Sequence, residues 1–458
     1  MKRIAILTAG GDTPALNATL HGAVTRANAR RVEVVGLIKG FNSLLNPRCP
    51  SVRLNPLFQT IPELDPTIGG TVLGASRDYV DGDDQEAIGG ILDRLGRLGI
   101  EGVICVGGDG TLNAVQAIAD HFPAVLAPKT IDNDLGLNYM SEPQDWEEVP
   151  NPAPGAMRVR RKHVRAMRLQ DMVNYVTPGF ATSVYVSAQG IQRLRTTAES
   201  HRRIAIIEVM GRHSGFLALG AAYGQPDIIL VPESPLDPER LLARVLELYD
   251  IQKHVVIVVA EGVMDAEGRP LGSETQVVDP AGNIKYGGAA AAVKRLLLER
   301  LDDDYFTSRR RNQSARAAFF ARQVGHTQRG GRPILFDRFH AAQLGGKAVD
   351  MLLEGQRNAV ATLQWTPERG YGVDSIEANR LRDRWGNIHS RLMHPSFYDE
   401  ERMQPSPLGV AYLTSIFTNA VGHDDVEWLR SQIFDPAHLH QPYLSVNTEI
   451  HKRIRFLD

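Results

Sequence analysis

The chain has 458 residues, of which 43% are hydrophobic and 23% are charged, and its formal net charge is −2. This length predicts two or more domains, and the balanced charge argues against a nucleic-acid partner. Only Cys49 and Cys105 are present, so a disulfide framework is not expected. No signal-peptide pattern and no apolar run of roughly 20 residues occurs, so we expect a cytoplasmic protein without a membrane partner.

Apolar runs alternate with helical patterns through the first 127 residues, which predicts an α/β fold on a largely parallel sheet. We expect strands at residues 4–8, 32–38, 102–106 and 124–127. A helix that opens at Pro14 follows the first strand, and a helix over 111–121 follows the third. Ligands of open α/β sheets bind beyond the carboxyl ends of the strands, so the turns there are candidate sites.

A charged segment over residues 137–169 follows, acidic in its first half and basic in its second. We interpret it as an exposed insertion whose halves attract each other weakly; contact with a neighbouring subunit or a phosphate is the alternative. A second series begins near residue 171, with strands expected at 203–210, 227–232 and 254–260 and helices at 215–224, 238–252 and 287–301. This series predicts a second α/β lobe. We assign no chemical role to the polar sequence after residue 378.

Two glycine turns follow apolar strands, Gly10-Gly11-Asp12 and Gly107-Gly108-Asp109-Gly110. Glycine lets backbone N–H groups approach phosphate oxygens, and the N-terminus of a following helix favours an anion. Asp109 is suited to hold the Mg²⁺ that neutralises those oxygens. Purely structural turns are the alternative, but two such turns that each carry an aspartate favour phosphate binding.

The stretch PKTIDND at 128–134 places two carboxylates two residues apart after a strand. If this segment is extended, Asp132 and Asp134 share one face and Asn133 points away. One carboxylate could then accept a hydroxyl proton while the other assists the metal. An Asx-rich turn that caps a helix is the alternative.

Arginines flank the strand expected at 203–210: Arg203 opens it, and Arg212 follows its end. Arginine pairs with phosphate through a planar fork, so both are candidates for an anionic ligand, with a surface salt bridge as the alternative for either one. Glu261, at the end of the next buried run, could accept sugar hydroxyls. Arg329 lies beside a further glycine turn.

In this order the segments resemble the 6-phosphofructokinase family, whose members use ATP or pyrophosphate. The matching stretches span roughly residues 4 to 350, and they are LTAGGDTPALNA, GGTVLGASR, VGGDGT, PKTIDND, AESHRRIAIIEVMGRHSGF, VAEG and GHTQRGG. NAD kinases and lipid kinases share GGDGT but would not be expected to carry PKTIDND with SHRRIAIIEVMGR. The resemblance implies two Rossmann-like three-layer lobes with mainly parallel sheets. It assigns 1–136 with 333–377 to the donor lobe, 137–169 to an insertion, 170–332 to the sugar-phosphate lobe and 378–458 to a C-terminal extension.

The resemblance also implies phosphorylation of fructose 6-phosphate at its 1-hydroxyl by Mg-ATP. It implies a donor site made of Gly11, Arg77, Gly108, Asp109, Gly110, Thr111 and Lys129, with Asp109 on the metal. It implies Asp132 as the general base and, as further catalytic residues, Thr130, Asp134, Arg77 and Arg212. The sugar phosphate would contact Thr130, Asp132, Arg203, Met210, Gly211, Arg212, Glu261, His326 and Arg329. Arg203 would reach across from a neighbouring subunit, which implies a homo-oligomer, either a dimer or a tetramer.

One position departs from the family pattern. Phe320 stands where bacterial relatives have a sugar-phosphate arginine, so Arg322 or Arg316 would have to substitute for it. A catalytically weak sensing subunit on the same fold is therefore an alternative, although the three site aspartates are intact.

Two positions bear on the donor. Pyrophosphate-using relatives have Asp after GGD and Lys before TIDND, and this chain has Gly110 and Lys129, one marker of each kind. An aspartate at position 110 would exclude ATP by overlap and charge repulsion, whereas glycine removes both obstacles. Lys129 is long and flexible and can lie near the phosphates of either donor. The sequence therefore favours ATP, with pyrophosphate as the alternative.

Overall fold

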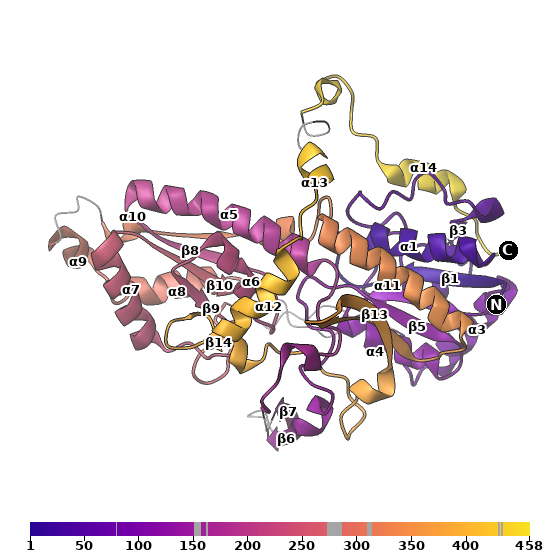
Figure 1. Ribbon diagram of the computed structural model, residues 1–458, viewed down its shortest axis with the longest axis horizontal. Helices are drawn as coiled ribbons and strands as arrows, with labels where there is room; N and C mark the ends of the chain where they lie inside the picture. The colour runs from indigo at the N-terminus through magenta and orange to yellow at the C-terminus, as the bar shows by residue number, and fades with distance from the viewer. Residues whose placement is uncertain are drawn as a thin grey trace.

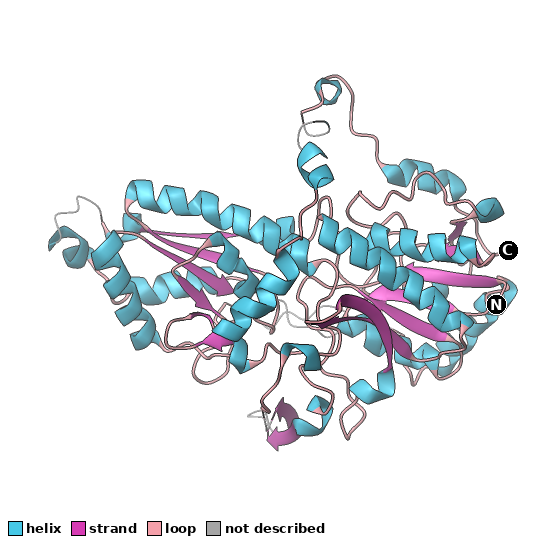
Figure 2. Cartoon of the chain, in the orientation of Figure 1, coloured by secondary structure: helices cyan, strands magenta, loops and turns pink. Residues whose placement is uncertain are grey.

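The computed structural model describes residues 1–78, 80–150, 157–161, 164–272, 286–308, 314–428, 431 and 434–458. Two α/β lobes lie beside each other, each with helices on both faces of a central sheet (Figures 1 and 2). This arrangement confirms the predicted fold class. It resembles two Rossmann-like units joined along the edge where the strands end.

The first lobe is built on a seven-stranded sheet in the order β13-β12-β5-β4-β1-β2-β3. Its strands are β1 (Arg3–Thr8), β2 (Glu33–Leu37), β3 (Ser51–Arg53), β4 (Val103–Gly107), β5 (Ala124–Pro128), β12 (Ala359–Thr366) and β13 (Gly370–Glu377). The five inner strands pair in parallel, and only the edge strands β3 and β13 are antiparallel. Near-continuous burial along β1, β4 and β5 is the pattern of strands covered on both faces.

Helices cover both faces of this sheet. On one face, α1 (Leu16–Ala29) and α11 (Leu335–Leu353) contribute to one hydrophobic core, and on the other face α3 (Gln85–Arg97) and α4 (Asp109–Ala119) contribute to a second. In α3 the buried residues Ile88, Ile91 and Leu95 recur at the spacing of one helical face. The Asp84 carboxylate caps this helix by accepting a hydrogen bond from the Ala87 N–H at 2.9 Å.

The second lobe contains a four-stranded parallel sheet in the order β11-β8-β10-β9. Its strands are β8 (Ile204–Val209), β9 (Ile228–Leu230), β10 (Val255–Ala260) and β11 (Phe319–Gln323). Its longer helices are α5 (Phe180–His201), α7 (Pro238–Gln252) and α8 (Ala289–Leu298). The shorter helices of the chain are α2 (Phe41–Leu45), α6 (Phe216–Gly220), α9 (Asp303–Ser308), α10 (Ala315–Ala318), α12 (Pro407–Phe417), α13 (His423–Trp428) and α14 (Val446–Arg453). Among the described residues, no helix has both the length and the apolar composition that a membrane crossing requires.

The segment 137–169 differs from the exposed insertion that we expected. Residues 137–139 are buried, and the buried Asp145 carboxylate forms an ion pair with Arg165 at 2.8 Å. The antiparallel strands β6 (Trp146–Pro150) and β7 (Met157–Arg161) project from the body as a hairpin (Figure 1). The acidic and basic halves therefore meet as expected, but they are anchored on a buried carboxylate; Lys162 of the basic half lies outside the described residues.

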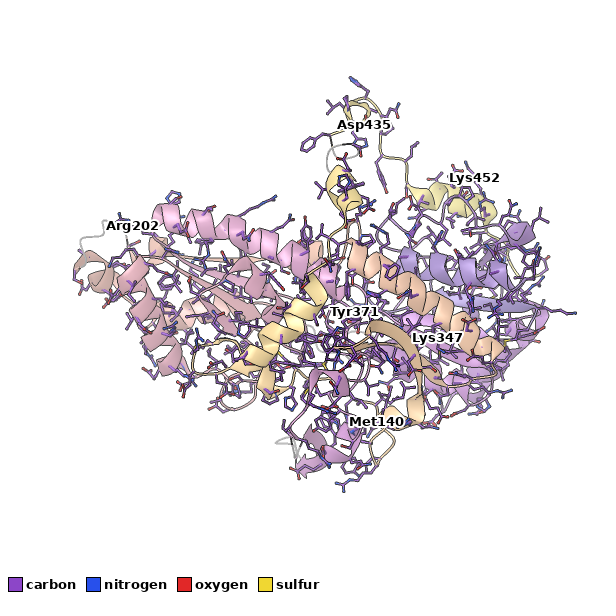
Figure 3. All side chains as sticks on the ribbon, viewed as in Figure 1. Met140, Arg202, Lys347, Tyr371, Asp435 and Lys452 are labelled. Carbon is purple, nitrogen blue, oxygen red and sulfur yellow. The ribbon has the colours of Figure 1, made fainter. Side chains whose placement is uncertain are left out.

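The chain after β13 runs along both lobes before it leaves the body. The short strands β14 (Tyr398–Asp399) and β15 (Gln404–Pro405) pair with each other, and α12 follows them. Asp435 then lies on an arm that projects from the molecule, while Lys452 lies back on the first lobe (Figure 3). There the chain pairs with β3 through Arg455 and Ser51.

Candidate active site

A cavity lies between the two lobes, at the carboxyl ends of β1, β4, β5 and β8. The space between its walls is about 680 Å³, part of it open to solvent. Most of the predicted site residues line it: Gly11, Arg77, Gly108, Asp109, Gly110, Thr111, Lys129, Thr130, Asp132, Arg212 and Arg329. The expectation that strand ends would bring these segments together is therefore met.

The glycine turn after β4 forms the middle of the cavity wall. Gly108 is the N-cap of α4, so Asp109 and Gly110 already belong to the first helical turn, two residues before the predicted start. An acidic residue in a first turn is favourable because of the helix dipole. The N-terminus of α4 thus faces the cavity and suits an anion. A Cβ placed on Gly110 would have no heavy atom within 4 Å, so the space beside this residue is open.

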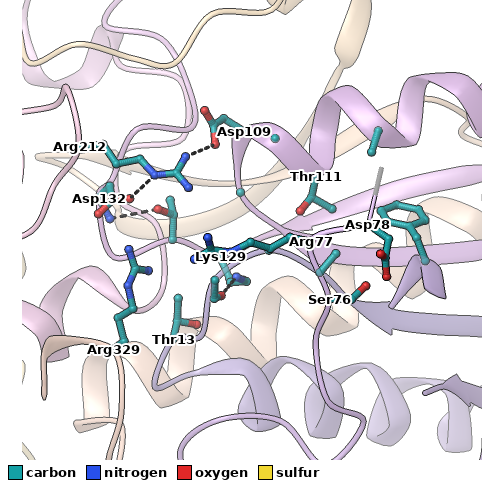
Figure 4. Close-up of a pocket in the computed structure, with 18 residues that line it drawn as sticks. Thr13, Ser76, Arg77, Asp78, Asp109, Thr111, Lys129, Asp132, Arg212 and Arg329 are labelled. Atoms are coloured by element: carbon teal, nitrogen blue, oxygen red, sulfur yellow. Dashed lines mark hydrogen bonds and ion pairs between the residues drawn. The ribbon is translucent and has the colours of Figure 1, made fainter. Parts of the chain in front are cut away.

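The cavity is also lined by six residues that were not predicted from the sequence: Ala9, Thr13, Phe41, Ser76, Asp78 and Ala114. Ser76 and Asp78 flank Arg77 at one end of the cavity, and Asp132, Arg212 and Arg329 lie at the other (Figure 4). A signal for Ser76 was available, because it lies in the stretch GGTVLGASR that carries the family resemblance. Nothing in the sequence around Phe41 points to a cavity.

Arg212 extends between two carboxylates of the first lobe (Figure 4). Its Nη1 lies 3.7 Å from Asp109 Oδ1, and its Nε lies 3.9 Å from Asp132 Oδ2. The Asp132 N–H donates to the Thr130 hydroxyl at 3.0 Å. Asp132 is only 3% exposed, and its Oδ1 has no hydrogen-bond partner among the described residues. A buried carboxylate oxygen that lacks a donor is well placed to accept one from a ligand.

The segment PKTIDND is not extended, so the predicted geometry of its two carboxylates is wrong. Asn133 has a φ of 56°, a left-handed conformation that asparagine tolerates. Its amide is buried, donating to the Tyr412 hydroxyl at 2.7 Å and accepting from the Thr177 N–H at 2.9 Å. The resulting bend leaves Asp132 on the cavity wall and places Asp134 in the fully buried layer behind it.

Burial and charge raise the pKa values of two carboxyl groups at the cavity. The pKa of Asp134 is raised well above its usual range, because the carboxyl is buried and lies near Asp109 and Asp132. Burial, and then the charge of Asp132, raise the pKa of Glu261 to about 7, although the carboxylate accepts the Arg212 N–H at 3.0 Å. Both carboxyl groups therefore hold a proton more readily than an exposed carboxyl group would.

Lys129 is the most deeply buried cation of the cavity, with 2% of its side chain exposed. Its ammonium group contacts the Gly11 carbonyl oxygen, next to the first glycine turn. Burial, and then the nearby Arg329, lower the pKa of Lys129 to about 7, while Asp12 and Asp132 act in the opposite direction. The charge of this residue therefore depends on what occupies the cavity.

The remaining sugar-site candidates follow strands of the second sheet, with one exception. Met210 and Gly211 follow β8, and the Met210 N–H donates to Gln328 at 3.0 Å. The exposed His326 accepts the Arg329 N–H through its backbone carbonyl at 3.0 Å.

Arg203 is the exception, since it precedes β8 whereas Arg212 follows it. Six strand residues separate the two ends by about 20 Å. Arg203 therefore does not belong to the cavity of its own chain.

Among the described residues, neither Arg316 nor Arg322 takes the place of the arginine expected at Phe320. Arg316 lies exposed on α10, and Arg322 donates to the Ala321 carbonyl with its guanidinium 5.9 Å from the Phe320 ring. Neither arginine lines the cavity.

Two further residues touch the site from the C-terminal extension, where no chemistry was predicted. The Ser390 hydroxyl donates to Asp109 Oδ2 at 2.5 Å, and the Arg391 N–H donates to the Asp134 carbonyl at 2.6 Å. No local pattern could have revealed them, because Ser390 lies 281 positions from Asp109 and Arg391 lies 258 positions from Asn133.

The described residues contain no group of three or more His, Cys, Asp or Glu side chains arranged to hold a metal by themselves. Mg²⁺ at phosphoryl-transfer sites is commonly bound by one or two carboxylates together with phosphate oxygens and water. Asp109, beside the N-terminus of α4, suits that kind of site.

Comparison with known proteins gives consistent matches. Residues 3–141 and 171–352 match the family described as Phosphofructokinase. The chain is 33% identical over 371 residues to ATP-dependent 6-phosphofructokinase 3 of Streptomyces coelicolor, covering 80% of this chain and 91% of that protein. It is 31% identical over 369 residues to the pyrophosphate–fructose 6-phosphate 1-phosphotransferase of Amycolatopsis methanolica, with the same coverage.

A solved structure shares the fold. The pyrophosphate-dependent phosphofructokinase of Nitrosospira multiformis superimposes with a TM-score of 0.68 at 18% identity, over 92% of both chains. The family match excludes 142–170 and the residues after 352, so Ser390 and Arg391 lie outside it. It includes every residue that lines the cavity, and the chain belongs to the phosphofructokinase family.

Proposed function

We propose that the protein transfers a phosphoryl group from Mg-ATP to the 1-hydroxyl of fructose 6-phosphate, with Asp132 as the general base. The observation that carries the proposal is that Asp132 and the glycine turn of Asp109 line one cavity and are bridged by Arg212. Phosphoryl transfer requires alignment of two anionic substrates and neutralisation of the developing charge. The cavity offers a phosphate-binding helix N-terminus, a carboxylate base and several cations for these tasks.

The residues present fit a bound Mg²⁺. Asp132 Oδ1 is a buried acceptor without a donor among the described residues, and burial, followed by the charges of Asp109 and Asp132, raises the pKa of Asp134. A divalent cation that arrives with the donor would offset the negative charges of Asp109 and Asp132. Asp109 would hold it, and the metal would supply charge neutralisation at the phosphate oxygens.

The protein's own groups account for the remaining requirements. Asp132 accepts the proton of the sugar hydroxyl, and Thr130 and Asp134 support it. Arg212 and Arg77 neutralise the transferring group, while Met210, Gly211, Glu261, His326 and Arg329 hold the sugar phosphate. The lobe assignment follows: residues 1–136 with 333–377 bind the donor, and residues 170–332 bind the sugar phosphate.

ATP is our proposed donor. The open space beside Gly110 and the continuation of the cavity to Phe41 and Ala114 support it, because a nucleotide extends beyond its phosphates. Pyrophosphate is the second candidate, favoured by the buried Lys129 beside the glycine turns. Relatives named for each donor match at nearly equal identity, so the comparison does not separate them.

The test measures phosphorylation of fructose 6-phosphate with ATP and with pyrophosphate at equal Mg²⁺. We expect turnover with ATP, and activity with pyrophosphate alone would overturn the choice of donor. Asp132→Asn should lower kcat by about 10²–10⁴, the usual contribution of a general base, and leave sugar binding intact by calorimetry. Asp120→Asn, at the exposed end of α4, is the matched control. Near-normal turnover of Asp132→Asn would contradict its role as base.

A further inference from the structure

The C-terminal extension reaches into the cavity at Ser390. The Ser390 hydroxyl donates to Asp109 Oδ2 at 2.5 Å, while Asp109 Oδ1 faces Arg212 Nη1 at 3.7 Å. One oxygen of the Asp109 carboxylate therefore accepts a hydrogen bond from the C-terminal extension, and the other faces the second lobe. A carboxylate held in this way cannot rotate freely about its χ2 angle.

Arg391 fixes the segment that carries this serine. It is 2% exposed, and its guanidinium donates to the Asn133 carbonyl at 2.7 Å, the Asn133 side-chain oxygen at 3.0 Å and the Asn174 carbonyl at 2.7 Å. Its backbone N–H donates to the Asp134 carbonyl at 2.6 Å. The residue after Ser390 is thus bonded directly to the loop that carries Asp132.

Contacts also hold the chain on either side of Ser390 and Arg391. His389 stacks on Trp146 with ring centroids 4.1 Å apart, and its Nε2 lies 2.7 Å from the Asp383 carboxylate. On the other side, the Met393 N–H donates at 2.7 Å to Glu233, which also accepts the Gly215 N–H at 2.9 Å. The segment 389–393 therefore contacts the insertion through Trp146, the loop that carries Asp132, and the second lobe through Glu233.

We propose that Ser390 is a positioning residue for phosphoryl transfer, holding the Asp109 carboxylate for the metal-bound donor while Arg391 anchors the segment to the loop of Asp132. This inference rests on the proposed function, because it assumes that Asp109 faces the metal. Hydrogen-bonded partners that orient metal ligands typically affect metal affinity or activity by about 10–100-fold. The effect of Ser390 should fall in that range.

The test compares Ser390→Ala and Ser390→Thr with the native enzyme in two measurements. The first is the affinity for Mn²⁺, followed by electron paramagnetic resonance, in the presence of a non-hydrolysable ATP analogue. The second is steady-state kinetics at saturating fructose 6-phosphate. For Ser390→Ala we expect Mn²⁺ affinity and kcat to fall about 10–100-fold with sugar affinity unchanged. Ser390→Thr, which keeps the hydroxyl at a half-exposed site, should restore both.

Ser396→Ala is the matched control, because this hydroxyl, six residues after Ser390 in the same C-terminal extension, bonds to His394 rather than to a cavity carboxylate. It should match the native enzyme in both measurements. Wild-type Mn²⁺ affinity in Ser390→Ala, or equal losses in Ser390→Ala and Ser390→Thr, would overturn the positioning role and leave the proposed function standing. A native enzyme that phosphorylates fructose 6-phosphate with neither donor would overturn the proposed function, and this inference with it.

Discussion

Gly110 is the residue at which the donor can be selected. It lies in the first turn of α4, and the space beside it is open for a group larger than hydrogen. An aspartate would fill that space with negative charge at the position proposed for the α-phosphate. Two like charges about 4 Å apart repel by ~4 kcal/mol at an effective dielectric constant of 20, equivalent to ~10³ in binding.

We therefore predict that Gly110→Asp lowers kcat/KM for ATP by at least about 10²-fold and leaves fructose 6-phosphate binding unchanged. Gly110→Ala, which adds volume without charge, is the control and should lose far less. Kinetics with ATP together with sugar titrations would measure both. Equal ATP turnover in Gly110→Asp would show that this residue does not face the donor.

Lys129 gives a prediction that depends on pH. Its pKa is lowered to about 7 from an ordinary value of 10.5, so at pH 8 the amine is mostly neutral in the empty cavity. Phosphate oxygens beside it would favour the cation and raise the pKa, so donor binding at pH 8 should take up protons. Calorimetry of donor binding in buffers of different ionisation enthalpy would detect this uptake.

Lys129→Met is the matched variant and should show heats of donor binding that do not depend on the buffer.

The same shift in the pKa of Lys129 affects the stability of the fold. Because the folded protein disfavours the cation, the native state without donor should gain stability as pH rises from about 7 to 10.5. Buffer-independent heats for the native protein at pH 8 would contradict the placement of Lys129 beside the donor.

The site residues that follow buried strands could be predicted from the sequence. The residues that reach the site from distant parts of the chain could not. Asp109 and Asp132 each follow a buried strand, and parallel strands end on one edge, so their meeting could be expected. Ser390 follows no strand or recognisable turn and reaches Asp109 across 281 positions. The bend at Asn133 escaped prediction for the same reason, because its amide is satisfied by Tyr412 and Arg391, far along the chain.

At the level of elements, prediction succeeded where burial is continuous. The runs of β1, β4, β8 and β10 are wholly or almost wholly buried, and all four appear in the structure where they were expected. β12 and β13 were not predicted. β13 is an edge strand with an exposed face, so its sequence carries a weaker apolar signal. Both strands follow α11, which packs against α1.

The contact between α1 and α11 is unusually close. A Cβ on Gly22 of α1 would lie 2.0 Å from the Ala342 carbonyl oxygen, and a Cβ on Gly345 of α11 would lie 2.1 Å from the Thr19 carbonyl oxygen. Neither neighbour can move alone, because both atoms belong to helix backbones. The two glycines thus set the distance between the helices and, through α11, the position of β12.

We predict that Gly22→Ala lowers the free energy of unfolding by about 1–3 kcal/mol or more, the usual effect of overpacking. Gly346→Ala, one position along α11 from Gly345, is the control, because its Cβ would meet Arg26 Cβ at an ordinary 3.6 Å. Helix propensity should make that control neutral or stabilising by up to about 1 kcal/mol. Thermal and denaturant unfolding measure both variants, and a Gly22→Ala protein as stable as the native one would contradict the close contact.

At the scale of the whole molecule, the position of Arg203 suggests that one chain does not complete its own sugar site. Arg203 lies at the opposite end of β8 from Arg212, and its neighbour Arg202 lies at the outer end of the second lobe (Figure 3). No rotation of the side chain spans a strand of about 20 Å. If this arginine contacts the sugar phosphate, as the family resemblance implies, a second copy of the chain must supply it.

Two defective variants should therefore restore each other. In an assembly of Asp132→Asn with Arg203→Ala, one site combines an intact base from one chain with an intact arginine from the other. Random pairing in a two-fold assembly makes half of the pairs mixed, each with one of two sites intact, so co-expression should recover about a quarter of native activity. Asp132→Asn with Asp109→Asn is the matched control, because both residues line the same cavity of one chain and no pairing can repair a site. Assays are made at a fructose 6-phosphate concentration at which Arg203→Ala alone is inactive. Recovery of activity in the first pair and none in the second would place Arg203 across the interface. No recovery in either pair would contradict a sugar site that is shared between two chains.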